Sequence, residues 1–571
     1  MGRKFVSFGV SHCARPDTHR WRSHAMLAVI SLAFIVLAGR AFWIQIANSD
    51  FYIAQGRARY QRRESLRVPR ARIVDRNGNV LAIGEPIYDL WVDPKRFAET
   101  SIAQLQVISS TLGIPIERLK SYRLASNRFI YLKRLVDVDS AELVLAKGIP
   151  GLYGVRGEKR YFPEGALAAQ VVGLAGRAGQ GVEGVELAAN KRLGGTVERR
   201  VVVVDRLGRV VEDPEYAGIP EPSADVVLSI DRNIQRMAFD ALKQGIERSE
   251  AKAGCAIVVD AASGEILAMV NMPTFDPNDD ASKKMMPTRN RALTDAFEPG
   301  STIKPIVVAL ALEKGVISER TTFDTAPGTL RFHGRVVHDT SNHGCINTAE
   351  IISKSSNIGM VKISELLSAE QMWRNFRAFG LGGLPLSGFP GITAGVLRPP
   401  ARWHPIEQGT MAYGYGLSVS IAQLARAYQV LANGGVIMPL SLYHSSVPHL
   451  PGPRVVTAAT ATSVLLMLEK TVEPGGTATM AGVPGYRVGA KTGTARKSDG
   501  NGYRSGQYLG IMAGIAPMSN PRIVVAVMID TPTKGSFYGG PVAGPIFARI
   551  LKGVLRYLGI VPDKALIAAR R

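Results

Sequence analysis

The longest run of apolar positions lies close to the N-terminus. It extends without a charge from Ala25 to Gly39, is interrupted by Arg40, and continues through Ala41–Ile46. Because an arginine side chain can bend toward the headgroups, the whole stretch comes near the ~20 residues that span a bilayer. We therefore predict one transmembrane helix over residues 24–46.

The charges before this helix predict its orientation, because loops rich in lysine and arginine tend to stay in the cytoplasm. Small residues that would suit signal-peptide cleavage are poorly placed around Leu37–Phe42, which favours an uncleaved anchor over a cleaved signal peptide. We expect a cytoplasmic tail at residues 1–23 and the rest of the chain outside the cytoplasm. The basic residues before the helix are Arg3, Lys4, Arg15, Arg20 and Arg22, and those after it are Arg57, Arg59, Arg62 and Arg63.

The pattern after the anchor predicts a module of mixed strands and helices at residues 47–221. A basic stalk with helical character at 48–70 leads into a strand, turn and strand over 70–82, where Asn77-Gly78 is a strong hairpin signal. A plain strand follows at Glu198–Val204. The module has no pairing of a nucleophile with a base and no phosphate loop, so we interpret it as a pedestal or docking domain.

The pattern changes near residue 222 and predicts a second domain at 222–560, with a short tail at 561–571. Two early strands, a helical middle and three late strands predict a five-stranded antiparallel sheet flanked by helices, so the fold class is multidomain α+β. The elements expected are a strand at 226–230, a helix at 231–249, strands at 256–259 and 266–270, helices at 301–315 and 348–366, strands at 486–495, 510–516 and 523–529, and a helix at 543–558.

Composition narrows the possible functions. A chain of 571 residues is too long for one core and predicts two or three domains. The net charge is +22, but the basic residues are spread out and no aromatic-interleaved basic stripe occurs, which argues against nucleic-acid binding. An anionic lipid surface or an acidic polymer fits this charge equally well. The three cysteines form no metal-type cluster with the nine histidines, so we expect no metal site.

The first candidate for chemistry is Ser301 with Lys304, at the start of an apolar helix that continues to Leu312. Residues three apart share a helix face, and a desolvated lysine can take the proton of a serine nucleophile. The helix alone leaves open whether Lys304 reaches outward to solvent or is held in the interior. The same spacing occurs at Ser249 and Lys252, in a stretch whose charges predict a solvated helix, so the spacing alone is weak evidence.

Two further groups add to this candidate site. Ser355 and Asn357 lie two residues apart on an expected turn. The Ser355 hydroxyl can relay a proton, and the Asn357 side chain can hold a substrate amide. Serine and asparagine also often cap helices, so this pair alone is weak evidence. A late strand carries Lys491-Thr492-Gly493-Thr494 and can pair with an extended peptide. The threonine hydroxyls and the lysine charge could bind a substrate carboxylate. The same residues would also fit the basic end of an ordinary strand. The backbone N–H groups of Ser301 and Thr494 can form an oxyanion hole.

In this order the three motifs, S-x-x-K, S-x-N and K-T-G, resemble the signature of the penicillin-recognising serine enzymes. The stretches 297–305, 412–419 and 538–543, together with the anchor and the hairpin at 75–78, resemble class B penicillin-binding proteins, most closely the septal type. The resemblance covers residues 24–558 and is densest in the last 350 residues.

The resemblance implies a peptidoglycan D,D-transpeptidase of the cell wall, in the inner membrane of a bacterium and without a cofactor. Ser301 would attack a D-Ala-D-Ala stem pentapeptide, Lys304 would take its proton, and Ser355 with Lys491 would protonate the leaving D-Ala. An acceptor amine then closes the cross-link, and β-lactams acylate the same serine. Division proteins and a glycan polymerase are implied partners. Asn357 would hold the amide of the acyl-enzyme. The substrate and β-lactam pocket implied is Ser356, Thr492, Gly493, Thr494, Tyr413, Tyr415, Arg496, Tyr503, Phe537 and Tyr538.

Two alternatives remain at this point. A D,D-carboxypeptidase or β-lactam hydrolase would use water in place of the acceptor amine, but the long N-terminal module and the anchor argue against it. A non-catalytic division scaffold or β-lactam sensor could share the fold; complete active-site motifs argue against a scaffold, and the short segment before the anchor is too small for a signalling domain.

Overall fold

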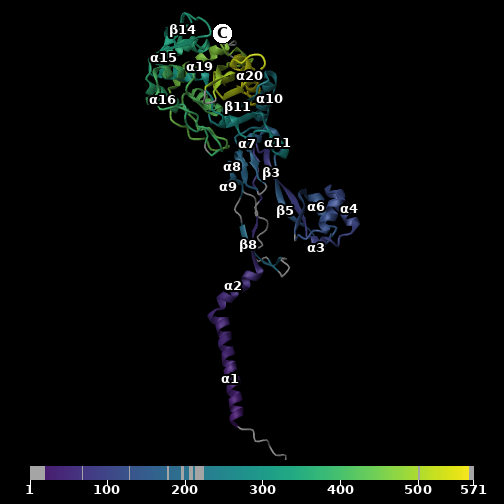
Figure 1. The fold of residues 1–571 in the computed structure, drawn as a ribbon. Helices are drawn as coiled ribbons and strands as arrows, with labels where there is room; N and C mark the ends of the chain where they lie inside the picture. Colours follow the sequence, from purple (N-terminus) through teal and green to yellow (C-terminus); the bar gives the residue numbers. More distant parts are fainter. Residues whose placement is uncertain are drawn as a thin grey trace, which may run out of the picture. The chain divides into compact units, whose positions relative to one another are not determined.

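The computed structural model describes residues 20–66, 69–127, 129–176, 179–194, 198–204, 210–212, 224–386, 388–498 and 502–564. The chain divides into two compact units, residues 1–68 with 196–220 and residues 69–195 with 221–571 (Figure 1). The expected cytoplasmic tail lies outside the described residues up to residue 19, and the expected C-terminal tail does so from residue 565. The domain limits expected at 47–221 and 222–560 stay a prediction.

The first unit contains the predicted anchor. Helix α1 (Arg20–Phe42) passes into a π-helical turn at Trp43–Ala47, and α2 (Ser49–Tyr60) follows. In the described part of the chain, one helix, Trp21–Ala47, is long and apolar enough to cross a membrane, and none of its most apolar window is buried against protein. A single-pass anchor accounts for such an uncovered apolar surface. The same unit holds a three-stranded sheet of β1 (Gln61–Leu66), β8 (Glu198–Val204) and β9 (Val210–Glu212).

The second unit begins with the predicted hairpin. Strands β2 (Ile73–Val74) and β3 (Val80–Val92) pair in an antiparallel manner across a turn that the Asp75 carboxylate closes by accepting from the backbone N–H groups of Asn77 and Asn79. The hairpin belongs to a sheet of order β10-β2-β3-β4, with β5 also on β3. Its other members are β4 (Ile130–Asp137), β5 (Leu152–Tyr161) and β10 (Val226–Val227), covered on one side by α3 (Pro94–Phe97), α4 (Ile102–Leu112), α5 (Ile116–Arg123) and α6 (Val138–Leu145).

The predicted five-stranded antiparallel sheet is confirmed, and so is the α+β fold class. Its order is β12-β11-β19-β18-β17, so the last strands of the chain insert beside the first and leave β17 at one edge. Strand β11 of this sheet is labelled in Figure 1. Its strands are β11 (Ala253–Asp260), β12 (Ile266–Met272), β17 (Gly489–Ser498), β18 (Tyr503–Ala516) and β19 (Ile523–Asp530).

Each face of this sheet packs against its own layer of helices. Alternate residues of a strand point to opposite faces, and in β11 Cys255 and Ile257 join one apolar core while Ala256 and Val258 join the other. The helices α10 (Arg232–Ser249) and α20 (Gly539–Tyr557) cover the second face. The first face carries a larger helical layer, α12 (Arg291–Thr294), α13 (Lys304–Glu313), α14 (Thr348–Ser353), α15 (Asn357–Glu365), α16 (Ala369–Ala378), α17 (Pro405–Met411), α18 (Ile421–Ala432) and α19 (Ala458–Val472).

Several elements differ in extent from the sequence prediction. The strand expected at 226–230 is shorter and pairs with β2 in a parallel manner, outside the main sheet. Helix α20 starts at Gly539, earlier than the expected residue 543. Pro541 does not prevent this earlier start, because it lies in the first turn, where a helix tolerates proline. Short elements complete the unit: α7 (Ala169–Val172), α8 (Gly184–Ala188), α9 (Asn190–Leu193), α11 (Asp280–Met285), and the hairpins β6 (Leu174–Ala175) with β7 (Gly181–Glu183), β13 (Thr322–Asp324) with β16 (Cys345–Asn347), and β14 (Thr329–Phe332) with β15 (Arg335–His338).

Phe547 tests the packing of α20 on the sheet. Its side chain is fully buried in the core between α10, α20 and the strands. We expect Phe547→Ala to lower the free energy of unfolding by about 3–5 kcal/mol, because it leaves a cavity as well as losing apolar burial. Leu558→Ala, at the exposed end of the same helix, should cost less than about 1 kcal/mol. Urea unfolding followed by tryptophan fluorescence compares the two; equal losses would contradict this packing.

Candidate active site

Ser301 lies on a tight turn at the edge of the main sheet. The 3₁₀ turn η3 (Gly300–Ile303) precedes α13, which starts at Lys304. Gly300 has a φ of +52° and donates its N–H to the carbonyl of Gly414 at 3.1 Å, so a residue without a side chain is needed there. The Ser301 side chain is partly exposed, and its hydroxyl bonds to no other residue in the described ranges. The turn therefore presents an unengaged hydroxyl to the solvent.

Lys304 is held in the interior, which decides between the two orientations left open above. The residue is fully buried, and its Nζ donates to the Ser355 carbonyl at 2.5 Å, the Asn357 Oδ1 at 2.8 Å and the Ser355 Oγ at 3.2 Å. Burial, and next the charge of Lys491, hold the pKa of Lys304 well below the usual value for lysine. A lysine of this kind can be neutral and so act as a base.

Lys491 reaches the same hydroxyl from the sheet. It is fully buried on β17, and its Nζ lies 2.9 Å from the Ser355 Oγ. Desolvation lowers the pKa of Lys491 to about 7. The Ser355 hydroxyl is thus shared by two lysines from different elements, and because a hydroxyl both donates and accepts, it can pass a proton between them.

Ser355 occupies the break between α14 and α15, with a left-handed backbone φ of +63°. The break is the turn expected within the helical stretch at 348–366. A non-glycine residue in this conformation is uncommon and has to be stabilised by its surroundings. The bond from Lys304 to the Ser355 carbonyl supplies part of this support.

Asp339 supplies the rest, and the sequence analysis missed it. Its carboxylate accepts from the Ser356 hydroxyl at 2.5 Å, from the backbone N–H of Ile358 at 3.1 Å and from the N–H of Asn357. Ser356 is buried and is the N-cap of α15, so its hydroxyl is engaged within the protein. Asp339 lies one residue beyond β15, and nothing in the local sequence marks it; only its contact across the fold gives it a part in the site.

The strand β17 packs directly against the nucleophile turn. A Cβ at Gly493 would lie 2.8 Å from the Pro299 carbonyl oxygen, so glycine is needed for this contact. The carbonyl of Thr494 accepts from the Tyr415 hydroxyl at 3.5 Å. The backbone of Thr494 also lies close to Gly300 in η3. An oxyanion hole formed by the backbone N–H groups of Ser301 and Thr494 stays a prediction.

The threonine side chains of β17 lie on the opposite face from Lys491. Thr494 Oγ1 accepts from the backbone N–H of Gly539 at 3.0 Å, and Thr492 lies near Gly540, both at the start of α20. Arg496 follows on the same face and is exposed. Binding of a carboxylate by these threonines stays a prediction.

The predicted aromatic residues form two separate groups. Tyr415 lies between Tyr413, at 5.8 Å between ring centroids, and Tyr503, at 6.3 Å, and the Tyr503 hydroxyl donates to Glu298 at 3.1 Å. Burial raises the pKa of Tyr413 to about 12 and also raises the pKa of Glu298. The three rings of this first group therefore support one another at the edge of the site.

The second aromatic group contains a residue that the sequence analysis missed. Phe537 contacts Tyr538 at 4.5 Å and stacks on Tyr508 at 4.2 Å, and Tyr508 is the register partner of Arg496 on the neighbouring strand. A correct register for β17 and β18 would have revealed Tyr508, but the two strands are joined by a long hairpin whose register the sequence does not fix.

Comparison with known proteins agrees with this geometry. Residues 254–552 match the family model "Penicillin binding protein transpeptidase domain", and residues 65–228 match the "Penicillin-binding Protein dimerisation domain". The chain belongs to the class B penicillin-binding proteins. The family and the enzyme class predicted from the motifs are thereby confirmed.

Relatives of this penicillin-binding protein match over nearly its full length. The "Probable peptidoglycan D,D-transpeptidase PenA" of Neisseria meningitidis is 40% identical over 97% of this chain and 96% of its own length. The "Peptidoglycan D,D-transpeptidase FtsI" of Escherichia coli strain K12 is 35% identical over 95% of this chain and 93% of its own length.

Two solved structures are also similar. The transpeptidase domain of penicillin-binding protein 3 from Burkholderia pseudomallei is 46% identical, with a TM-score of 0.55, over 59% of this chain and 97% of its own. A peptidoglycan synthetase from Bifidobacterium adolescentis is 27% identical, with a TM-score of 0.70, over 88% of this chain and 98% of its own.

The contacts of Asp339 predict that it positions the Ser355–Asn357 turn. Asp339→Ala should slow acylation by fluorescent penicillin about 10- to 100-fold, because small displacements of catalytic groups are costly. The melting temperature should change little, because the expected effect is on the rate of acylation. Asp324→Ala, which removes an exposed carboxylate from β13, is the matched control and should acylate normally. A normal rate in Asp339→Ala would rule out the positioning role.

The two charges that face Lys304 predict opposite shifts of its titration. Lys491 lowers the pKa of Lys304, so Lys491→Ala should raise that pKa and move the rise of the acylation rate to higher pH, since Lys304 must lose its proton to act as a base. Asp339 raises the pKa of Lys304, so Asp339→Asn should move the rise to lower pH. Acylation rates from neutral to alkaline pH measure both shifts. Lys497→Ala, on the same strand, should leave the profile unchanged; shifts of the same sign in the first two variants would contradict this account.

Proposed function

We propose that this protein is a septal peptidoglycan D,D-transpeptidase that works through an acyl-enzyme on Ser301. The convergence of two buried lysines on the Ser355 hydroxyl is the observation that carries the proposal, because Lys304 follows the turn η3 that holds Ser301. A serine nucleophile needs a base and a route for its proton, and this arrangement contains both.

In the first step, Ser301 Oγ attacks the carbonyl of the penultimate D-Ala and Lys304 takes its proton. The backbone N–H groups of Ser301 and Thr494 stabilise the oxyanion. The proton then passes through Ser355 to the leaving amine of the terminal D-Ala, with Lys491 supporting the transfer. Asn357, which already accepts a bond from Lys304, orients this base and holds the amide of the acyl group.

In the second step, the amine of a neighbouring stem peptide attacks the ester and releases Ser301. A β-lactam follows only the first step, because its ring carbonyl takes the place of the D-Ala carbonyl. Thr492, Gly493 and Thr494 would border the bound substrate on β17. The two aromatic groups, with Arg496, would border the side chain of a β-lactam, and Ser356 would act indirectly through Asp339.

The remaining parts of the chain fit a protein of the division site. We propose that the N-terminal helix anchors it in the inner membrane with its N-terminus in the cytoplasm and the catalytic domain in the periplasm. Residues 47–221 would form the pedestal and 222–560 the catalytic domain. The proposed septal role follows the likeness to relatives named FtsI. Contacts with a glycan polymerase and other division proteins are a further part of the proposal.

Covalent labelling of the full-length protein with fluorescent penicillin tests the nucleophile and the base. Ser301→Ala should abolish labelling, and Lys304→Ala should slow it about 100- to 10,000-fold, because general-base catalysis typically contributes that much. Ser249→Ala and Lys252→Ala carry the same spacing at an unrelated place and are the matched controls. Persistent labelling in Ser301→Ala would refute the assignment.

The fate of the acyl-enzyme separates a transpeptidase from a carboxypeptidase or β-lactam hydrolase. A transpeptidase should transfer a donor peptide to an amine acceptor and release penicilloate only slowly. Rapid, repeated release of free penicilloate would overturn the proposal in favour of a hydrolase.

A further inference from the structure

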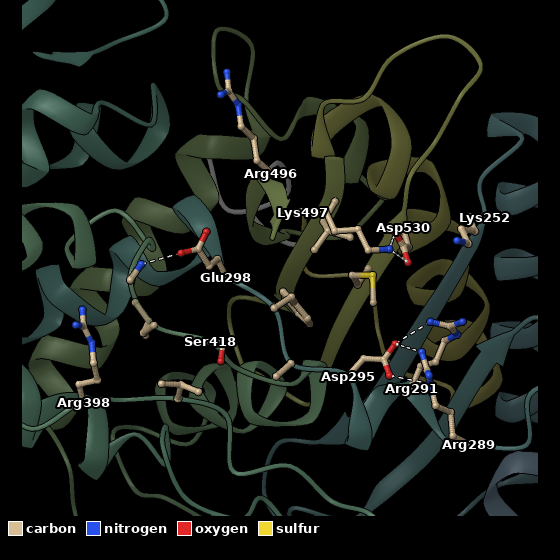
Figure 2. Close-up of a pocket in the computed structure, with 17 residues that line it drawn as sticks. Lys252, Arg289, Arg291, Asp295, Glu298, Arg398, Ser418, Arg496, Lys497 and Asp530 are labelled. Carbon is tan, nitrogen blue, oxygen red and sulfur yellow. Dashed lines mark hydrogen bonds and ion pairs between the residues drawn. The ribbon is translucent and has the colours of Figure 1, made fainter. Parts of the chain in front are cut away.

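A second cleft lies beside the nucleophile turn, on the same face of the main sheet. It is open, with a volume of about 1080 Å³, and is bounded by the ends of β17–β19 on one side and by the segments around 296–298 and 416–418 on the other (Figure 2). Neither Ser301 nor Lys304 lines it. Among the residues that line it, the mechanism above gives a part to Arg496 alone.

The cleft is rich in positive charge. Its lining carries three carboxylates, Asp295, Glu298 and Asp530, against six cations. Two of the carboxylates are already paired, Asp295 with two arginines and Asp530 with Lys497. The cations are Lys252, Arg289, Arg291, Arg398, Arg496 and Lys497.

Part of this charge is free for a ligand. Lys252 and Arg496 form no ion pair with any carboxylate in the described ranges. Arg289 shares Asp295 with Arg291, at 3.1 Å and 2.7 Å, and the Arg289 side chain is 55% exposed. Figure 2 shows Arg289, Arg291 and Lys252 at one end of the cleft and Glu298 at the other. An anionic ligand therefore fits the end that is distant from Glu298.

The wall of the cleft also presents an open backbone edge. Phe297 exchanges both of its backbone hydrogen bonds with Val419, at 2.9 and 2.8 Å. In an extended segment the neighbouring residues direct their N–H and C=O groups to the opposite edge. The backbone groups of Ala296 and Glu298 form no hydrogen bond within the described ranges, and both residues line the cleft. An unpaired edge of this kind binds an extended peptide by adding a strand.

The place of the cleft relative to the nucleophile suits the second substrate. On β17, Gly493 contacts the nucleophile turn and Lys497 lines the cleft, a separation of four residues or about 13 Å. A pentapeptide in extended form spans about 17 Å. Glu298 lies three residues before Ser301 and lines the cleft, so its carboxyl group can accept a hydrogen bond from the amine of such a peptide.

We propose that this cleft binds the acceptor: an extended, carboxylate-bearing stem peptide that pairs with the backbone of Ala296 and Glu298 and places its carboxylates near Arg289 and Lys252. The proposal rests on the proposed transpeptidase function and adds to it where the second substrate lies. The amine-bearing end of the peptide points toward Ser301. The donor, in contrast, lies along the outer edge of β17.

The test compares the two half-reactions in the full-length protein in detergent. Acylation is measured with fluorescent penicillin, and transfer is measured from a thioester donor to either a stem tetrapeptide or the small amine D-alaninamide. In the double variant Lys252→Glu/Arg289→Glu, transfer to the tetrapeptide should fall about tenfold at low salt, because like charges now face its carboxylates. Acylation and transfer to D-alaninamide should stay within about twofold.

Two controls separate the cleft from general effects. Lys470→Glu/Arg556→Glu makes the same change of charge at exposed positions on α19 and α20, outside the cleft, and should transfer normally. Ala296→Pro removes one free N–H without a change of charge, and Asp295 before it has the extended conformation that proline requires (φ −85°, ψ 118°). It should also lose transfer to the tetrapeptide, whereas Ala296→Ser should not.

Several outcomes would overturn the proposal. Unchanged transfer to the tetrapeptide in both cleft variants would place the acceptor elsewhere. An equal loss of acylation and transfer would mean that the cleft supports the fold or the donor. Normal transfer with lost binding of a division protein would assign the cleft to that partner. Failure of the proposed function is distinguished by the wild-type protein, which would then neither acylate at Ser301 nor transfer to any amine.

Discussion

Two lysines buried beside one serine hydroxyl are the constraint on which the rest of this structure depends. Burying an ammonium group is costly, and burying two close together is more so, unless one of them loses its proton. Lys304 and Lys491 both reach Ser355, from different elements, and the charge of Asp339 partly offsets that of Lys304. The two lysines therefore bind protons less readily than they would in water. A neutral lysine can take the proton of a serine nucleophile.

This arrangement requires three distant parts of the chain to meet with little tolerance. The nucleophile turn contacts β17 through positions where a side chain would clash, at Gly493 and Gly300. The turn at Ser355 has a strained backbone that Lys304 and Asp339 support. Because strand β17 enters the sheet next to β18 and late in the chain, the site is complete only after the last strands have added to the first. The geometry of the catalytic residues therefore depends on the strand order of the sheet.

The edge position of β17 also organises the surroundings of the site. One side of this strand pairs with β18, and the other is an open edge of the sheet, where the proposed donor subsite lies. The same geometry recurs in the cationic cleft, where the extended segment before Ser301 is paired on one edge and open on the other. Two open edges on either side of the nucleophile turn give the two peptides of a cross-linking reaction separate approaches to a single serine.

The sequence by itself determined the parts that depend on local pattern and on the order of residues. The apolar run predicted the anchor helix, and alternation predicted the strands of the main sheet. Motif order predicted the family, which the comparisons confirm, and proposed catalytic roles for Ser301, Lys304, Ser355, Asn357 and Lys491. Only the tertiary structure decided the parts that depend on contacts across the fold. It decided that Lys304 faces inward, that Asp339 supports the turn at Ser355, that Tyr508 stacks on Phe537, and that a charged cleft lies behind Glu298. The physical reason is that periodicity is a property of neighbouring residues, whereas burial, strand register and shared charge are set by residues far apart in the chain.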